Sequence, residues 1–214
     1  MIFRKFILLS LTAVVVTAAP VIAAPSYFVA MAEQKTEKSA RVLVENLGQE
    51  AVALLSNKDL STDAKRDEFD RLVSRDFDMP LIGRFVLGKH WRKASAQQKS
   101  EYQNLFKQYI VTTYQKRIGE YSGENLKIVK ARPLNKKEIL VNSQIIRPSG
   151  PAIKLDWRVR ISKNGDQKIV DLVVENVSMA LTHRDEFSSV ISKNGGNVNG
   201  LIETLRKHIA AAKG

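Results

Sequence analysis

The segment Ile153-Lys154-Leu155-Asp156-Trp157-Arg158-Val159-Arg160-Ile161 alternates without interruption between apolar and charged side chains. A period of two is typical of a β-strand that packs one face on a core and leaves the other in solvent. The pair Asn164-Gly165, which favours a tight hairpin turn, follows after two residues. We therefore expect the segment to be a strand of an antiparallel sheet, with partners on both sides of it in the sequence.

Three further strands are expected around this segment. Residues 126–132 and 137–147 precede it, the second ending at a Pro-Ser-Gly-Pro turn, and residues 168–180 follow it as the last strand. The last strand is apolar on both sides, with Val170, Leu172 and Val174 on one side and Ile169, Val173, Val177 and Met179 on the other. A strand of this kind either is covered on both faces or lines a cavity with one of them. The sequence leaves both possibilities open.

Helices are expected on both sides of the sheet, because there the apolar residues recur at helical spacing. A helical part covers residues 36–94, and a long helix with an aromatic-rich face covers residues 95–121. Within the first part, Asp78, Pro80 and Gly88 mark the ends of a short apolar helix. Two C-terminal helices fall within residues 185–213. Helices, four antiparallel strands in the sheet region 125–180, and further helices make an α+β domain.

The N-terminus has the pattern of a secretory signal peptide. Arg4 and Lys5 precede an apolar run, small residues follow, and residues 1–32 contain no acidic side chain. The sequence Ala30-Met31-Ala32 predicts cleavage after Ala32, and cleavage after Ala23 is also compatible with the pattern. We therefore expect an exported protein, soluble outside the cytoplasm, whose folded domain covers residues 33–214.

Composition excludes several classes of site. The 214 residues include no cysteine and only three widely separated histidines, so we expect no disulfide, no thiol nucleophile and no metal site. No nucleophile-elbow or phosphate-binding glycine pattern occurs. The formal net charge is +12, and many cations lie in the sheet region. Because the chain is expected to be exported, we interpret this basic face as a solvated surface or a docking surface for anionic lipid or an acidic protein, not as a nucleic-acid site.

Two separated stretches carry a family resemblance. The first consists of Phe77-Asp78-Met79-Pro80, Val86-Leu87-Gly88-Lys89-His90-Trp91-Arg92 and the long helix from residue 97. The second is Val170-Asp171-Leu172-Val173-Val174-Glu175-Asn176-Val177-Ser178, followed by Arg184 and Phe187. In this order they resemble the exported MlaC-type lipid carriers, also called toluene-tolerance or ABC-transporter auxiliary proteins, over residues 38–207. The family usually has glycine where this chain has Asn176, and because asparagine tolerates the left-handed region we expect the fold to be kept.

The resemblance implies a periplasmic lipid-binding protein with an NTF2-like curved antiparallel sheet of about four strands, a long helix and a helical subdomain around an apolar pocket. Members of the family carry phospholipid between an outer-membrane lipoprotein–porin complex and an inner-membrane ABC-transporter complex, which maintains the lipid asymmetry of the envelope. We therefore expect a monomeric carrier that is not an enzyme and that holds lipid as cargo without a cofactor.

The pocket of such a carrier is expected to be lined by apolar side chains from the helices and the sheet. The lipid-binding candidates are Phe85, Tyr109, Ile110, Leu155, Trp157, Val159, Val173, Val177 and Met179. Arg158 and Arg184 are the candidates for contact with a phosphate headgroup at the mouth.

Three alternatives remain open at the level of sequence. The cargo could be another lipid, such as a hopanoid, on the same fold. An NTF2-like enzyme would need a polar group inside the cavity, for which Asp171 or Glu175 beside Tyr109 would serve. An interaction module recruited to the envelope through its basic face would instead have a solid core and no bound lipid.

Overall fold

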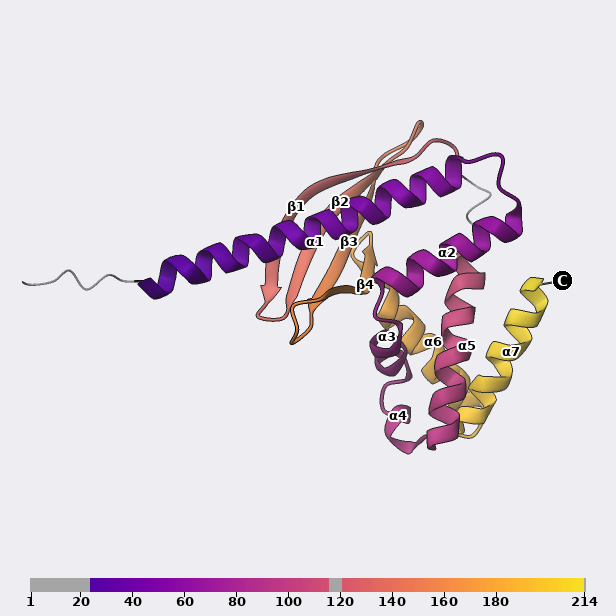
Figure 1. Cartoon of the computed structure of the whole chain (residues 1–214). Helices are drawn as coiled ribbons and strands as arrows, with labels where there is room; N and C mark the ends of the chain where they lie inside the picture. The colour runs from indigo at the N-terminus through magenta and orange to yellow at the C-terminus, as the bar shows by residue number, and fades with distance from the viewer. Residues whose placement is uncertain (1–23, 116–120, 214) are drawn as a thin grey trace, which may run out of the picture.

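The computed structural model describes residues 24–115 and 121–213 (Figure 1). Most of the expected signal peptide therefore lies outside the described residues, as do residues 116–120 of the expected long helix. The first helix, α1 (Ala24–Ser56), begins before residue 36, where the helical part was expected to start. The cleavage position after Ala32 falls within this helix, and the position after Ala23 falls at its beginning.

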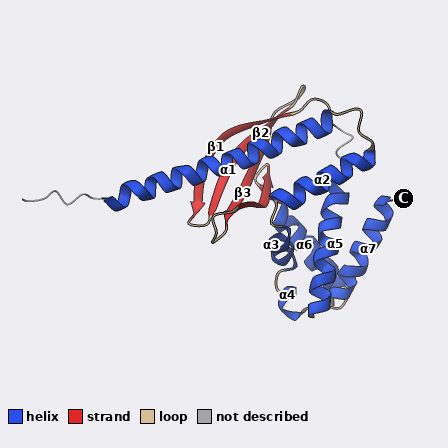
Figure 2. Ribbon diagram, in the orientation of Figure 1, coloured by secondary structure: helices blue, strands red, loops and turns tan. Residues whose placement is uncertain are grey.

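The sheet is antiparallel and its strands lie side by side in sequence order. They are β1 (Asn125–Asn135), β2 (Glu138–Ile146), β3 (Ile153–Ile161), β4 (Gln167–Val174) and β5 (Val177–Ser178). The strand predicted at 153–161 is confirmed residue for residue, and the four-strand antiparallel order is confirmed with the short β5 added at one edge. Figure 2 shows that the sheet is curved and that helices continue the chain before and after it, which makes an α+β fold.

One face of the sheet packs against α1, which crosses it diagonally (Figure 1). Leu155, Trp157 and Val159 of β3 are buried on this inner face together with a stripe of α1. The stripe consists of Ala40, Val44, Leu47 and Leu54. A helix with its apolar residues at this spacing buries one side only, and here that side meets the sheet. The charged residues of β3 lie on the opposite, outer face.

Strand β4 contains a β-bulge that the sequence pattern did not reveal. Arg158 pairs with Asp171, but the next residue, Val159, pairs with Ile169, so Val170 is an extra residue. A bulge of one residue changes which side chains share a face. Ile169 therefore lies on the inner face with Leu172 and Val174, and the predicted grouping of Ile169 with Val173 was wrong.

The strand expected to continue to residue 180 is also interrupted. β4 ends at Val174, and Glu175 and Asn176 form a two-residue turn with φ values of 46° and 67°. Positive φ at both central residues is the requirement of a type I′ hairpin turn, which reverses the chain into β5. Asn176, which stands where the family usually has glycine, does adopt the left-handed conformation.

Helix α6 (Met179–Lys193) begins directly after β5, at Met179 and not near residue 185. Its N-cap is Ser178, whose Oγ accepts a hydrogen bond from Leu181 N at 3.1 Å. The apolar residues between 177 and 180 are compatible with either a strand or the first turn of a helix. The cap, and not the apolar pattern, fixes where the helix starts.

The remaining helices form a second layer beside the sheet. They are α2 (Thr62–Asp76), α3 (Met79–Leu87), α4 (His90–Lys93), α5 (Ala96–Gln115) and α7 (Val198–Lys213). The ends expected for α3 are confirmed, because Asp78 accepts a hydrogen bond from Leu81 N and Gly88 follows with φ 55°. The capping box before α5 is formed in both directions between Ser95 and Gln98.

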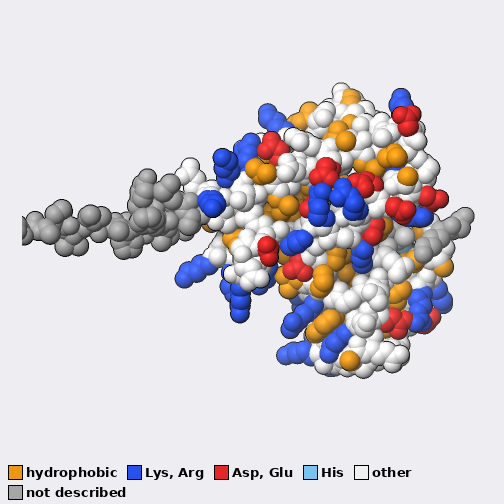
Figure 3. All heavy atoms as spheres, in the orientation of Figure 1, with side chains coloured by type: hydrophobic (Ala, Val, Ile, Leu, Met, Phe, Trp, Pro, Cys, Tyr) orange, Lys and Arg blue, Asp and Glu red, His pale blue; other side chains and the backbone are white. Residues whose placement is uncertain are grey.

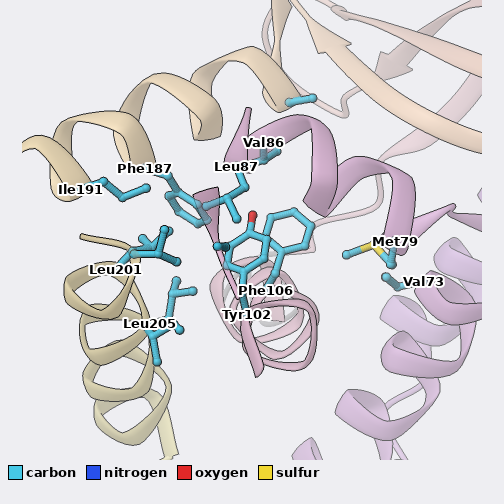
Figure 4. Close-up of a cluster of buried hydrophobic side chains, with 14 residues drawn as sticks. Val73, Met79, Val86, Leu87, Tyr102, Phe106, Phe187, Ile191, Leu201 and Leu205 are labelled. Atoms are coloured by element: carbon cyan, nitrogen blue, oxygen red, sulfur yellow. The ribbon is translucent and has the colours of Figure 1, made fainter. Parts of the chain in front are cut away.

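The helical layer has its own hydrophobic core, built around three aromatic side chains (Figure 4). Tyr102 and Phe106 of α5 stack on each other, and Phe187 of α6 meets both edge-on. The Tyr102 hydroxyl donates to the Gly83 carbonyl oxygen at 3.0 Å, which satisfies it inside the core. Burial raises the pKa of Tyr102 far above its ordinary value. Two separate cores thus meet in one domain, one under the sheet and one among the helices.

The turn at Asn176 offers a test of backbone conformation. Asn176→Ala is expected to lower the free energy of unfolding by about 1–2 kcal/mol, because a non-glycine side chain without a local hydrogen bond is strained in the left-handed region. Asn176→Gly should cost much less, since glycine adopts positive φ freely. Urea denaturation followed by circular dichroism measures both. Both variants remove the bond from Lys154 Nζ to Asn176 Oδ1, so equal losses would show that this bond, and not the backbone, sets the stability of the turn.

Candidate functional site

A cavity of about 320 Å³ lies where the sheet, α1 and the helical layer meet. Its walls come from α1, α2, α3, α5 and α6 and from residues of β3 and β4. The lining residues are Leu47, Ala51, Leu54, Leu55, Phe69, Leu72, Val73, Phe77, Met79, Ile82, Phe106, Ile110, Tyr114, Trp157, Asp171, Leu172, Met179, Ala180 and His183. Except for Tyr114, Asp171 and His183, these side chains are apolar or, in Trp157, carry a satisfied N–H. The cavity therefore suits an apolar ligand.

Asp171 lies in the wall, but both of its carboxylate oxygens accept hydrogen bonds from other groups of the protein. One carboxylate oxygen accepts from Ser178 Oγ at 2.6 Å, and the other accepts from Ala180 N at 3.0 Å. A guanidinium nitrogen of Arg158 lies 3.6 Å from the same carboxylate. A buried carboxylate with these partners is stabilised in place and fixes the start of α6. Asp171 thus has a structural role.

The other polar groups form a chain at one end of the cavity. The Tyr114 hydroxyl lies 3.1 Å from His183 Nε2, and His183 Nδ1 lies 3.1 Å from a carboxylate oxygen of Glu186. Because a carboxylate only accepts, Nδ1 carries the proton, and in neutral His183 the tyrosine donates to Nε2. Tyr109 meets the His183 ring edge-on, and burial together with the charge of Glu186 raises the pKa of Tyr109. The chain holds the His183 ring in one orientation within the wall.

The structure brings three of the nine expected pocket residues into the cavity wall, namely Ile110, Trp157 and Met179. Leu155 and Val159 share the inner face of the sheet with Trp157 but are packed within the core under α1. Tyr109 lies behind the wall, in contact with His183 and Phe187.

The other three expected pocket residues lie outside the cavity. Val173 pairs with Asp156 on the outer face of the sheet, because the bulge reverses the side on which it points. Phe85 and Val177 are 39% and 53% exposed. Alternation along one strand could not reveal the bulge, and helical spacing alone did not distinguish the outer side of α3 from the inner.

Both headgroup candidates also lie outside the cavity lining. Arg158 is on the outer face of the sheet, where its guanidinium bonds to Glu138 at 2.7 Å. Arg184 lies on α6 with its guanidinium carbon 5.1 Å from the centre of the Phe85 ring.

Sequence reasoning missed the walls that α1 and α2 contribute. Leu47, Ala51 and Leu54 on α1 and Phe69 and Leu72 on α2 face the cavity. Their helical spacing was recognised, but it did not assign them to a cavity, because a stripe has the same spacing whether it meets another side chain or an empty space.

In residues 24–115 and 121–213 no group of three or more metal-ligating side chains is placed to hold an ion. Within the same ranges no helix combines the length and the apolar character that crossing a bilayer requires.

The chain is similar in sequence to a protein family and to two of its named relatives. The model of the MlaC protein family matches residues 45–207. The toluene tolerance protein ttg2D of Pseudomonas putida is 21% identical over 69% of this chain and 68% of its own length. The intermembrane phospholipid transport system binding protein MlaC of Haemophilus influenzae is 26% identical over 58% of this chain and 62% of its own.

A solved structure has the same fold. The phospholipid-binding protein from Ralstonia solanacearum, determined in complex with a phospholipid, superposes with a TM-score of 0.71 at 23% sequence identity. The match covers 82% of this chain and 99% of that one.

The structural role of Asp171 can be tested directly. Asp171→Ala is expected to lower the free energy of unfolding by about 3–5 kcal/mol, because it removes two hydrogen bonds to a charged acceptor and leaves the buried Ala180 N–H without a partner. Ser178→Ala, which removes one of the same hydrogen bonds and the helix cap, should cost about 1–2 kcal/mol. Chemical denaturation of both variants measures the difference. A fully stable Asp171→Ala protein would contradict the assignment.

Proposed function

This chain belongs to the MlaC protein family, whose model covers well over half of it, and from that premise we propose that it is a phospholipid carrier. The observation that carries the proposal is the cavity, whose walls are almost entirely apolar and which lies between two hydrophobic cores. The relative from Haemophilus influenzae, which is named for phospholipid transport, and the phospholipid-bound structure of a similar fold support it.

The physical need for such a cavity follows from the cargo. Exposing two acyl chains of about 15 methylenes each to water costs on the order of 24 kcal/mol at ~0.8 kcal/mol per methylene. A lipid therefore crosses an aqueous compartment only with its tails buried. Transfer from a bilayer to an apolar cavity is nearly neutral by the same reasoning, so the carrier itself needs no energy source.

The size of the cavity indicates how much of the lipid it holds in this state. The cavity volume of about 320 Å³ is at the low end of the roughly 300–1,000 Å³ that is typical of sites for drug-sized ligands. A phospholipid with two full acyl chains needs a larger space. We infer that the walls separate when lipid enters, with the sheet core on one side and the helical core on the other.

The cellular role is proposed on the same basis. The chain would be exported with residues 1–32 as its signal peptide and residues 33–214 as the mature monomeric carrier. It would receive phospholipid from one membrane-bound complex and deliver it to another, with an ABC transporter among its partners. The direction of net transport would be set by those partners.

An enzyme in the same cavity is the less favoured alternative. The carboxylate that such a site would use, Asp171, is already paired with Ser178, Ala180 and Arg158. Glu175 is exposed in the turn after β4, where its carboxylate accepts from Lys154 N. Neither supplies the buried, unpaired carboxyl group that general acid–base chemistry in this cavity would need.

The decisive experiment is native mass spectrometry of the protein purified from the periplasm, followed by solvent extraction and lipid analysis. A stoichiometric diacyl phospholipid supports the proposal. A hopanoid or another polycyclic lipid would change the cargo and keep the carrier. Protein that is lipid-free and takes up none from vesicles would overturn the proposal.

A pair of alanines on α1 allows the cavity to be filled with a matched control. Ala51 lines the cavity, whereas Ala53, on the same helix, is exposed. Ala51→Trp is expected to reduce co-purified lipid at least about tenfold, because the indole occupies space that the acyl chains require. Ala53→Trp should retain lipid at the level of the unaltered protein. Thermal unfolding of both variants checks that they are folded, and equal lipid content in the two would contradict the assigned cavity.

A further inference from the structure

The outer sides of α3 and α6 expose large apolar side chains where the two helices pack together. Phe85 on α3 is 39% exposed and Leu181 on α6 is 49% exposed, and Val177, just before α6, is 53% exposed. Arg184 reaches from α6 to α3, where its guanidinium stacks over the Phe85 ring and lies against Gly88. Exposed apolar groups gathered in this way are typical of an interaction surface.

Helix α3 and the short helix α4 that follows it are rich in positive charge. The chain from Met79 to Lys93 carries Arg84, Lys89, Arg92 and Lys93, all exposed, and has no acidic residue. Figure 3 shows Lys and Arg side chains beside hydrophobic ones over α4 and the adjoining end of α3. The acidic residues of the nearby part of α6 are Asp185 and Glu186, and Glu186 is bonded to His183. Cations therefore exceed anions on this surface.

We name this surface the α3–α6 patch and define it by its exposed apolar and cationic side chains. The exposed members are Arg84, Phe85, Lys89, Arg92, Lys93, Val177 and Leu181, and the half-buried Arg184 completes the set. Helices α3 and α6, which carry Arg84, Phe85, Leu181 and Arg184, also form one wall of the cavity. Met79 and Ile82 of α3 and Ala180 and His183 of α6 line the cavity on the inner side. The patch is thus the outer surface of that wall.

We propose that the α3–α6 patch docks on the surface of a bilayer that contains anionic lipid. Each Lys or Arg near such a surface contributes about 1 kcal/mol of attraction. Phe85 and Leu181 can enter the boundary between headgroups and acyl chains, as the apolar side of an interfacial helix does. An acidic protein would match the cations, but a bilayer also takes up the exposed apolar side chains. The inference rests on the proposed carrier function and deepens it, because docking places one wall of the cavity against the membrane.

Sedimentation with vesicles tests the docking. The full protein is mixed with vesicles of phosphatidylcholine alone or of phosphatidylcholine with phosphatidylglycerol. We expect binding to the anionic vesicles only, weakening as the salt concentration rises. Equal binding to both vesicles, or no binding to either, would overturn the proposal, and capture of an acidic partner in place of vesicles would do the same.

Two pairs of variants separate the patch from a general effect of charge or hydrophobicity. Lys89→Glu with Arg92→Glu is compared with Lys127→Glu and Lys130→Glu, which make the same change of charge on the sheet. Leu181→Ser is compared with Val129→Ser, since Val129 on β1 is similarly exposed at 51%. The patch variants are expected to bind anionic vesicles at least about tenfold more weakly, a loss of 1.4 kcal/mol or more, while the matched controls bind normally. Equal losses in patch and control variants would overturn the proposal.

Lipid content distinguishes this proposal from the carrier function on which it rests. Patch variants that lose vesicle binding but still contain lipid when purified from the periplasm would support docking as a separate property. Protein that contains no lipid but binds anionic vesicles through the patch would overturn the carrier function and keep the docking surface. Patch variants that sediment normally would overturn the docking surface whatever their lipid content.

Discussion

The architecture depends on one buried carboxylate, that of Asp171. It lies in β4, accepts hydrogen bonds from Ser178 and Ala180 at the start of α6, and faces Arg158 of the neighbouring strand. Taking a carboxylate out of water costs several kcal/mol, and only partners in fixed positions offset that cost. The direction in which α6 leaves the sheet is therefore set, and with it the position of the wall that α6 gives to the cavity.

A second link ties the other side of the helical layer to the same strand. The backbone N–H of Asp78, at the cap of α3, donates to the carbonyl oxygen of Ile169 at 2.9 Å. Between these links the sheet core and the helical core approach each other without merging, and the cavity occupies the space left between them.

Much of the element order was predictable because it follows from local pattern. β3 was predicted residue for residue from its alternation, and α7 from its helical spacing. The ends of α3 were predicted from Asp78 and Gly88, whose capping roles depend only on their immediate neighbours. The residues that line the cavity were less predictable. Trp157 and Ile110 were among the predicted pocket residues, but Ala51 and Phe69 were not. An apolar stripe on a helix has the same spacing whether it packs on side chains or lines a cavity.

The sequence by itself determined the α+β order, the inner face of β3, the ends of α3 and the resemblance to the MlaC family, since each of these depends on patterns within short stretches of the chain. Tertiary structure alone decided the bulge at Val170, the early start of α6 and the exclusion of Val173 from the cavity. Those features depend on pairing between strands and on the partners of Asp171, which are set by contacts between elements. Local periodicity carries no information about such contacts, so the faces of β4 could be assigned only once the sheet was assembled.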